Sequence, residues 1–102
     1  MPLHKVTTLS HLRPGAALRV TVDAREIGVF NVAGQVLAVK NLCPHYGDAL
    51  HKGKVTDQNC VVCPGHGWHF DLATGACTSG NTQARLRTHK VFVKDGEIFI
   101  EV

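Results

Sequence analysis

Short runs of β-branched and other apolar residues dominate the first half of the chain. Runs of this kind at 17–22, 27–32 and 35–40 predict strands, because β-branched side chains favour extended backbone. The dipeptide Ala33-Gly34 separates the last two runs and predicts a tight hairpin turn. This half of the chain is therefore predicted to form neighbouring antiparallel strands.

A second hairpin is predicted near the end of the chain. The apolar segments 90–94 and 97–102 flank Asp95-Gly96, a strong two-residue hairpin signal. Within 97–102, Ile and Val residues alternate with Glu and Phe, which is the period of a strand with one buried face. Because no segment carries an apolar stripe of helical period over three turns, we predict an all-β fold, a small antiparallel sandwich or barrel.

Length and charge narrow the class of protein. With 102 residues, the chain is expected to form a single domain over 1–102. The net charge is only +3 and the basic residues are scattered, so nucleic acid is not an expected partner. No apolar run approaches the ~20 residues that cross a bilayer, and the N-terminal segment lacks the apolar stretch of a signal peptide. We therefore expect no membrane association and a cytoplasmic location.

Two cysteine–histidine pairs carry the strongest chemical signal in the sequence. Cys43 and His45 form the first pair, and Cys63 and His66 form the second. Each pair is surrounded by Pro and Gly, so both are predicted to lie in tight loops between strands, where backbone amides can approach a bound group closely. Thiolate and imidazole donors suit zinc or an iron–sulfur centre, and they disfavour magnesium and calcium.

Three kinds of site are compatible with these pairs. The cysteines could be small buried residues beside surface histidines, but two matched pairs make that improbable. A structural zinc site usually places two cysteines together and then two histidines together, whereas this chain interleaves them. A two-iron, two-sulfide cluster with both cysteines on one iron and both histidines on the other fits the order best.

At these two motifs the chain resembles the Rieske iron–sulfur proteins. Their pattern is Cys-x-His, a spacer, and then Cys-x-x-His, and here the segments read CPHYG at 43–47 and CPGHGWHFD at 63–71. The likeness extends over nearly the whole chain. It implies a Rieske fold with a two-loop cluster-binding subdomain, whose loops span about 43–50 and 63–70.

The resemblance also implies the ligands and the function. Cys43 and Cys63 would bind the inner iron, and His45 and His66 the outer iron, of one [2Fe-2S] cluster. The implied role is electron transfer without catalysis by the chain itself, as the ferredoxin component of a multicomponent ring-hydroxylating oxygenase system. A flavin-dependent reductase would donate the electrons and a terminal oxygenase would accept them. The alternative is the small subunit of an assimilatory nitrite reductase, which would associate with the large subunit.

Departures from the respiratory-complex members of the family suggest a low reduction potential. By resemblance, Asp48 and Gly65 occupy the positions at which the respiratory-complex proteins carry two disulfide-forming cysteines. Trp68 and Phe70 stand where they carry Ser and Tyr hydroxyls close to the cluster. Lacking those hydroxyls, the cluster is expected near the low end of the Rieske range, about −150 mV.

The remaining cysteines and histidines are expected to be structural or bystander residues. Cys60 and Cys77 are expected to be ordinary buried or half-buried thiols rather than a disulfide, since a reducing compartment disfavours disulfides. His51, His69 and His89 are expected to be exposed residues of strands or loops.

Overall fold

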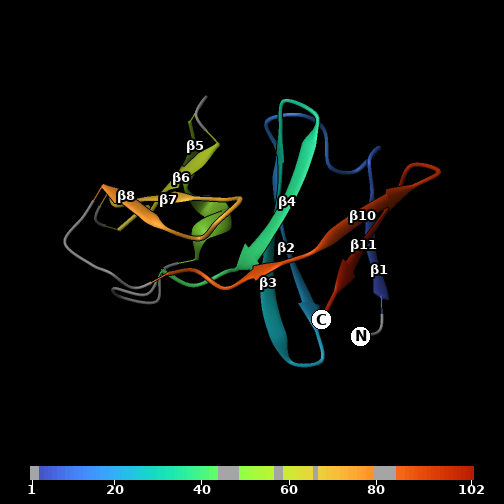
Figure 1. Ribbon diagram of the computed structural model, residues 1–102. Coiled ribbons are helices and arrows are strands. Elements are labelled where there is room, and N and C mark those ends of the chain that lie inside the picture. The colour runs from blue at the N-terminus through green and yellow to red at the C-terminus, as the bar shows by residue number, and fades with distance from the viewer. Residues whose placement is uncertain (1–2, 44–48, 57–58, 66, 80–84) are drawn as a thin grey trace.

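The computed structural model describes residues 3–43, 49–56, 59–65, 67–79 and 85–102 (Figure 1). These residues form short strands and one turn of 3-10 helix, η1 (Leu50–Lys52). The strands are β1 (Leu3–Thr8), β2 (Ala17–Val22), β3 (Arg25–Val32), β4 (Gln35–Lys40), β5 (Lys54–Val55), β6 (Cys60–Val62), β7 (His69–Asp71), β8 (Cys77–Ser79), β9 (Thr88–His89), β10 (Val91–Lys94) and β11 (Glu97–Glu101). Within these described ranges, no helix is long and apolar enough to span a membrane.

The strands form three antiparallel sheets, which confirms the predicted all-β class. Their orders are β1-β11-β10, β2-β3-β4-β9 and β5-β6-β7-β8. Figure 1 shows the β5–β8 sheet on one side of the molecule and the other two sheets packed together on the opposite side. The strands predicted at 17–22 and 35–40 coincide with β2 and β4.

Tight turns with left-handed backbone join the hairpins. Both predicted turns are present: φ is positive at Ala33 and Gly34, and it is 53° at Asp95 and 76° at Gly96. Positive φ at both central residues matches the right-handed twist of the flanking strands. A third turn of the same kind, at Asp23-Ala24, joins β2 to β3 without a glycine (φ 49° and 65°). This turn is not predictable from the sequence, because its residues lack the usual glycine-containing signature.

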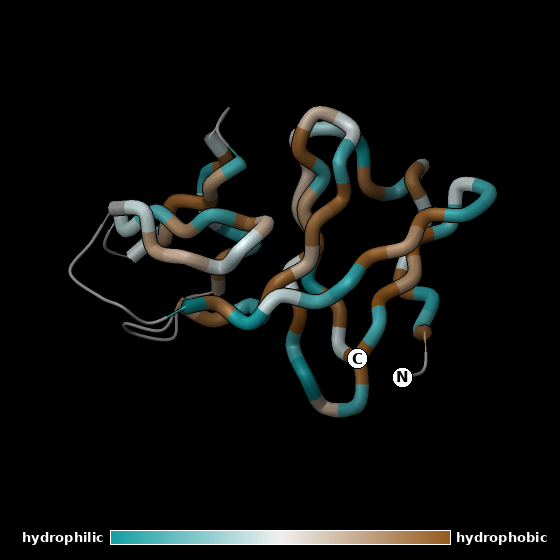
Figure 2. The backbone as a smooth tube through the Cα atoms, viewed as in Figure 1, coloured by the Kyte–Doolittle hydropathy of each residue, from teal (hydrophilic) through white to brown (hydrophobic). Residues whose placement is uncertain are grey.

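In the part of the chain that the structure describes, the core consists of two clusters of buried side chains. The first, the basal core, lies between the β1-β11-β10 and β2-β3-β4-β9 sheets, and Ile98 and Ile100 within it are fully buried, as their alternation predicts. Its members are Leu12, Val22, Ile27, Val29, Val36, Ala38, Ile98 and Ile100. Figure 2 shows hydrophobic residues along the strand centres and hydrophilic residues at most of the turns between them.

The second cluster, the loop core, joins the β5–β8 sheet to the rest of the molecule. It combines residues of β3 and β4 with residues of the β5–β8 region and with a cysteine from each predicted loop. Its members are Phe30, Val32, Val39, Cys43, Leu50, Val61, Cys63, Phe70, Leu72 and Leu86. Because the two loops contribute to one apolar cluster, packing holds them in a common structural unit.

The β5–β8 sheet is an insertion in the β2-β3-β4-β9 sheet. The chain leaves that sheet at the end of β4 and returns to it at β9, which pairs with β4 through Ala38↔His89 and Val39↔Thr88. The Lys40 amide donates a hydrogen bond to the Arg87 carbonyl at 2.7 Å, which closes the base of the insertion. Exit and re-entry points are thereby held side by side.

Candidate metal centre

The two predicted cysteine ligands lie at equivalent places in the fold. Cys43 follows the end of β4, and Cys63 directly follows β6. Each side chain is only 1% exposed, and both belong to the loop core. The structure therefore brings the two thiols into one buried cluster. The other two predicted ligands, His45 and His66, lie outside the described residues.

Backbone hydrogen bonds shape the second loop. The Cys63 amide donates to the Trp68 carbonyl at 2.7 Å, and the Gly67 amide donates to the Cys63 carbonyl at 2.9 Å. Gly67 has φ of +72°, a left-handed conformation that glycine adopts without steric cost. The β6–β7 hairpin thus ends in a compact turn that starts with Cys63, the predicted ligand. Trp68 is half-buried against the loop core, and Phe70 is fully buried within it.

A buried asparagine braces the first loop. Asn41, 1% exposed, accepts a hydrogen bond from the His51 backbone amide at its Oδ1 (2.8 Å). Its Nδ2 lies 2.8 Å from His51 Nδ1, and because an amide nitrogen only donates, the ring nitrogen accepts. These two bonds, which we call the Asn41–His51 brace, join the residues on either side of the loop at about 43–50. They fix its two ends at a set separation.

The brace depends on the residues around it. A Cβ atom on Gly28 would lie 2.8 Å from Asn41 Oδ1, so a side chain there would push the amide out of place. The backbone amide of Asn41 also donates a hydrogen bond to the Glu26 carbonyl at 3.0 Å. Burial lowers the pKa of His51 below its ordinary value, and the positive charge of Arg19 lowers it further. A neutral imidazole is the form that accepts the Asn41 hydrogen bond.

The helical turn η1 links the first loop to the second. Leu50 is fully buried in the loop core, and the Gly53 amide donates to the Leu50 carbonyl at 2.9 Å. A Cβ on Gly53 would lie 2.1 Å from the Val62 carbonyl oxygen, so only glycine allows the chain to pass this close to β6. Since Val62 precedes Cys63, the end of the first loop is packed directly against the start of the second.

The other cysteines behave as predicted, whereas three histidines do not. Cys60 is buried and Cys77 is half-buried, which is the burial predicted for ordinary thiols. The Cys60 sulfur lies 3.7 Å from Thr78 Oγ1. The expectation of exposed histidines is wrong: His51, His69 and His89 are half-buried. For His51 the sequence gives no local sign of this, because its hydrogen-bond partner Asn41 lies ten residues away.

The donor set fits a soft metal centre. Two buried thiols in one apolar cluster match the preference of iron–sulfur and zinc centres for sulfur ligands. Among the residues that the structure describes, no group of three or more His, Cys, Asp or Glu side chains is placed to hold a metal ion. A complete site would therefore need donors from the undescribed part of the loops, which is where both predicted histidine ligands lie.

Comparisons with known proteins agree with these motifs. The model of the family described as Rieske [2Fe-2S] domain matches residues 3–90. Ferredoxin CarAc of Metapseudomonas resinovorans is 33% identical over 97 residues, which cover 94% of this chain and 90% of the relative.

Solved structures extend the comparison to the fold. The ferredoxin of carbazole 1,9a-dioxygenase from Nocardioides aromaticivorans superposes with a TM-score of 0.92 and 32% identity, covering 98% of this chain and 97% of its own. A ferredoxin bound to the oxygenase of carbazole 1,9a-dioxygenase superposes with a TM-score of 0.88 and 31% identity. The match covers 96% of this chain and 100% of that ferredoxin. A structure described as a nitrite reductase NADPH small subunit superposes with a TM-score of 0.87 and 26% identity, with full coverage of both chains.

Proposed function

Because the chain belongs to the Rieske [2Fe-2S] domain family, we propose that it carries single electrons on a [2Fe-2S] cluster held between its two Cys–His loops. The proposed ligands are Cys43 and Cys63 on one iron and His45 and His66 on the other. The observation that carries the proposal is the burial of both cysteines in one cluster that the two loops share. We take residues 1–102 as a single domain, with the cluster held by loops at about 43–50 and 63–70.

When bound, the cluster supplies a site that gains and loses one electron. Two ferric ions, two sulfides and two thiolates sum to zero charge with neutral imidazoles, so an added electron meets less repulsion than at a four-thiolate cluster. The protein supplies the surroundings. Burial of Cys43 and Cys63 keeps water from the thiolates, while the Asn41–His51 brace and the turn at Gly67 hold the loops in shape. Such preorganised surroundings set the potential.

The best supported role is the ferredoxin component of a ring-hydroxylating oxygenase system. The sequence relative above and the carbazole dioxygenase structures support this role, and one of those structures holds a ferredoxin together with its oxygenase. In this role a flavin-dependent reductase donates the electron and a terminal oxygenase accepts it. Substrate chemistry then belongs to the partner, and the chain itself is an electron carrier. We place this exchange in the cytoplasm.

A second role is the small subunit of an assimilatory nitrite reductase. The full-length match at 26% identity to a structure described as a nitrite reductase NADPH small subunit supports it. Affinity purification from native cells separates the two roles by stoichiometry. A constant one-to-one complex with a large subunit would favour the nitrite reductase role, and isolation without a fixed partner favours the ferredoxin.

The cluster itself is tested by iron and acid-labile sulfide analysis, combined with absorption and electron paramagnetic resonance spectra. We expect two irons and two sulfides per chain, and a signal that appears on reduction. One zinc with no sulfide would contradict the proposal and favour the structural zinc interpretation instead.

A further inference from the structure

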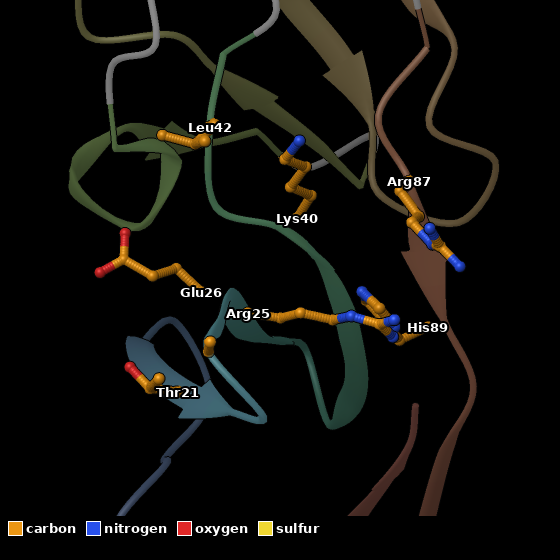
Figure 3. Close-up of a pocket in the computed structure, with 8 residues that line it drawn as sticks. Thr21, Arg25, Glu26, Lys40, Leu42, Arg87 and His89 are labelled. Carbon is orange, nitrogen blue, oxygen red and sulfur yellow. The ribbon is translucent and has the colours of Figure 1, made fainter. Parts of the chain in front are cut away.

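A pocket of about 570 Å³ opens on the sheet beside the metal centre (Figure 3). Its lining combines basic side chains with one large apolar side chain, that of Leu42. We call it the basic pocket and define it by Arg25, Lys40, Leu42, Arg87 and His89. Figure 3 shows the Arg25 side chain extending towards His89, while the carboxylate of Glu26 points to the other side.

The strand pairing explains why these basic residues meet. Arg25 begins β3 and Lys40 ends β4, and in that hairpin Lys40 pairs with Ile27, close to Arg25. On the other side of β4, the backbone amide of Lys40 donates a hydrogen bond to the Arg87 carbonyl at 2.7 Å. Three segments far apart in the sequence therefore present a basic side chain at the same end of one sheet.

The pocket has a clear excess of positive charge. Arg25, Lys40 and Arg87 are all exposed, and Glu26 is the carboxylate in the lining. Glu26 already lies 3.5 Å from the Arg19 guanidinium, so its charge is offset from outside the pocket. Exposed like charges held together in this way create a local positive potential that attracts anionic groups.

His89 is the fourth nitrogen-bearing side chain of the basic pocket. Burial lowers the pKa of His89, and the neighbouring charges of Arg87 and Arg25 lower it further. His89 is therefore expected to be neutral at physiological pH, so the positive charge of the pocket comes from Arg25, Lys40 and Arg87.

An apolar contact connects the pocket to the metal centre. Leu42 lines the pocket, is 38% exposed and directly precedes Cys43. A protein surface that covers Leu42 therefore approaches the loop of the first proposed ligand. Electron exchange needs such an approach, because a partner must come close to the cluster.

We propose that the basic pocket docks a carboxylate-rich surface of a redox partner protein, with Leu42 as the apolar contact between the charged groups. The inference rests on the proposed function, since the partner is one that exchanges electrons with the cluster. Exposed cations spread over three segments suit a broad acidic surface better than a small anion, which would need buried polar groups converging on it. Charged groups around an apolar contact are also the usual anatomy of transient protein interfaces.

Two charge-reversed variants test the location of this surface. The first is Arg25→Glu with Arg87→Glu in the pocket. The matched control is Arg13→Glu with Lys94→Glu, two exposed residues outside the pocket lining, which changes the net charge by the same amount. All proteins are prepared with the cluster, and their absorption spectra are compared first to establish that each variant folds and retains it.

The probe is a short poly-glutamate peptide titrated into each protein by calorimetry at low salt. Reversing two exposed charges is expected to weaken binding about tenfold in the pocket variant, and much less in the control. Equal weakening in both variants would show that only total charge matters and would overturn the proposal. If the purified wild-type protein contained no cluster, the proposed function would be refuted. The peptide titration would still show whether the basic pocket binds carboxylates, so the two failures are distinguishable.

Oxidation kinetics give a second measurement. One electron passes from the reduced protein to hexacyanoferrate(III), which becomes hexacyanoferrate(II), and stopped-flow absorbance follows the rate. The wild-type rate should fall as salt is added, because salt screens the attraction between the anion and the basic residues. In the pocket variant the rate should be several-fold lower and nearly independent of salt, whereas the control should resemble the wild type. A control as slow as the pocket variant would place the attractive surface elsewhere.

Discussion

Replacing Asn41 with alanine would test whether the first loop is held by the Asn41–His51 brace. The substitution removes the acceptor of the His51 amide and the donor to its ring, bonds of 2.8 Å each. Leaving a buried donor unsatisfied costs about 1–3 kcal/mol, and the lost packing adds about 1 kcal/mol. Asn41→Ala should therefore lower the free energy needed to open the loop by about 2–4 kcal/mol.

Asn31 provides a matched control in the same protein. It is also a buried asparagine with two hydrogen bonds, donating to the Leu12 carbonyl at 2.8 Å and accepting from the Gly34 amide at 2.9 Å. Asn31→Ala should cost a similar free energy of unfolding. It should leave the metal loops closed, however, because none of its bonds touches them.

The distinguishing measurement is the rate of cluster loss to a chelator, followed by absorbance under conditions where both variants remain folded. A loss of 2 kcal/mol raises the population of the open loop about 30-fold, so the cluster of Asn41→Ala should be lost about 30 times faster than that of the wild type. Asn31→Ala should stay close to the wild-type rate, since global unfolding remains rare. If both variants lost their clusters at the same rate, local bracing of the loop would be refuted.

Three further predictions follow from the site. Cys63→Ala should abolish the iron and sulfide content, whereas Cys77→Ala should retain it, and iron retained in Cys63→Ala would remove that cysteine from the ligand set. Trp68→Ser with Phe70→Tyr should raise the potential measured by voltammetry from near the ~−150 mV end of the range by supplying hydroxyls, and a wild-type value in the upper range would contradict this account. Finally, the lowered pKa of His51 means that the unfolded chain binds its proton more readily, so this contribution to stability is complete above its ordinary value of 6.5 and is lost as pH falls towards the folded pKa. Melting temperatures measured from pH 7.5 to 5 should show the decline, and it should be smaller in His51→Gln.

The parts of the fold that the sequence predicted are those with local signals. The bounds of β2 and β4 follow from their β-branched runs, and the turns at Ala33-Gly34 and Asp95-Gly96 follow from dipeptides that tolerate positive φ. The positions of the two cysteines were also predictable, because each loop carries its own motif. Each of these features is encoded within a few adjacent residues.

The parts that the sequence could not predict depend on distant partners. The strands β5 to β8 span two or three residues each, too few to show an alternating pattern, and they are extended because they pair with one another. The Asn41–His51 brace needs a glycine at position 28, and nothing near Asn41 in the sequence indicates that requirement. These features are determined by packing between residues that are far apart in the sequence, so no short sequence motif indicates them.

The closed base of the β5–β8 insertion has a consequence for how such proteins can be altered. Every member of the basal core lies outside residues 41–87, and the chain leaves and re-enters at Lys40 and Arg87, whose backbones are hydrogen-bonded at 2.7 Å. Insertions are tolerated where their two ends lie close together. The segment between these residues is therefore a cassette: a relative's counterpart could be grafted at the same two points, changing the redox properties while the basal scaffold stays the same. The principal requirement at the junction is that the graft fill the loop core where it meets Phe30, Val32 and Val39.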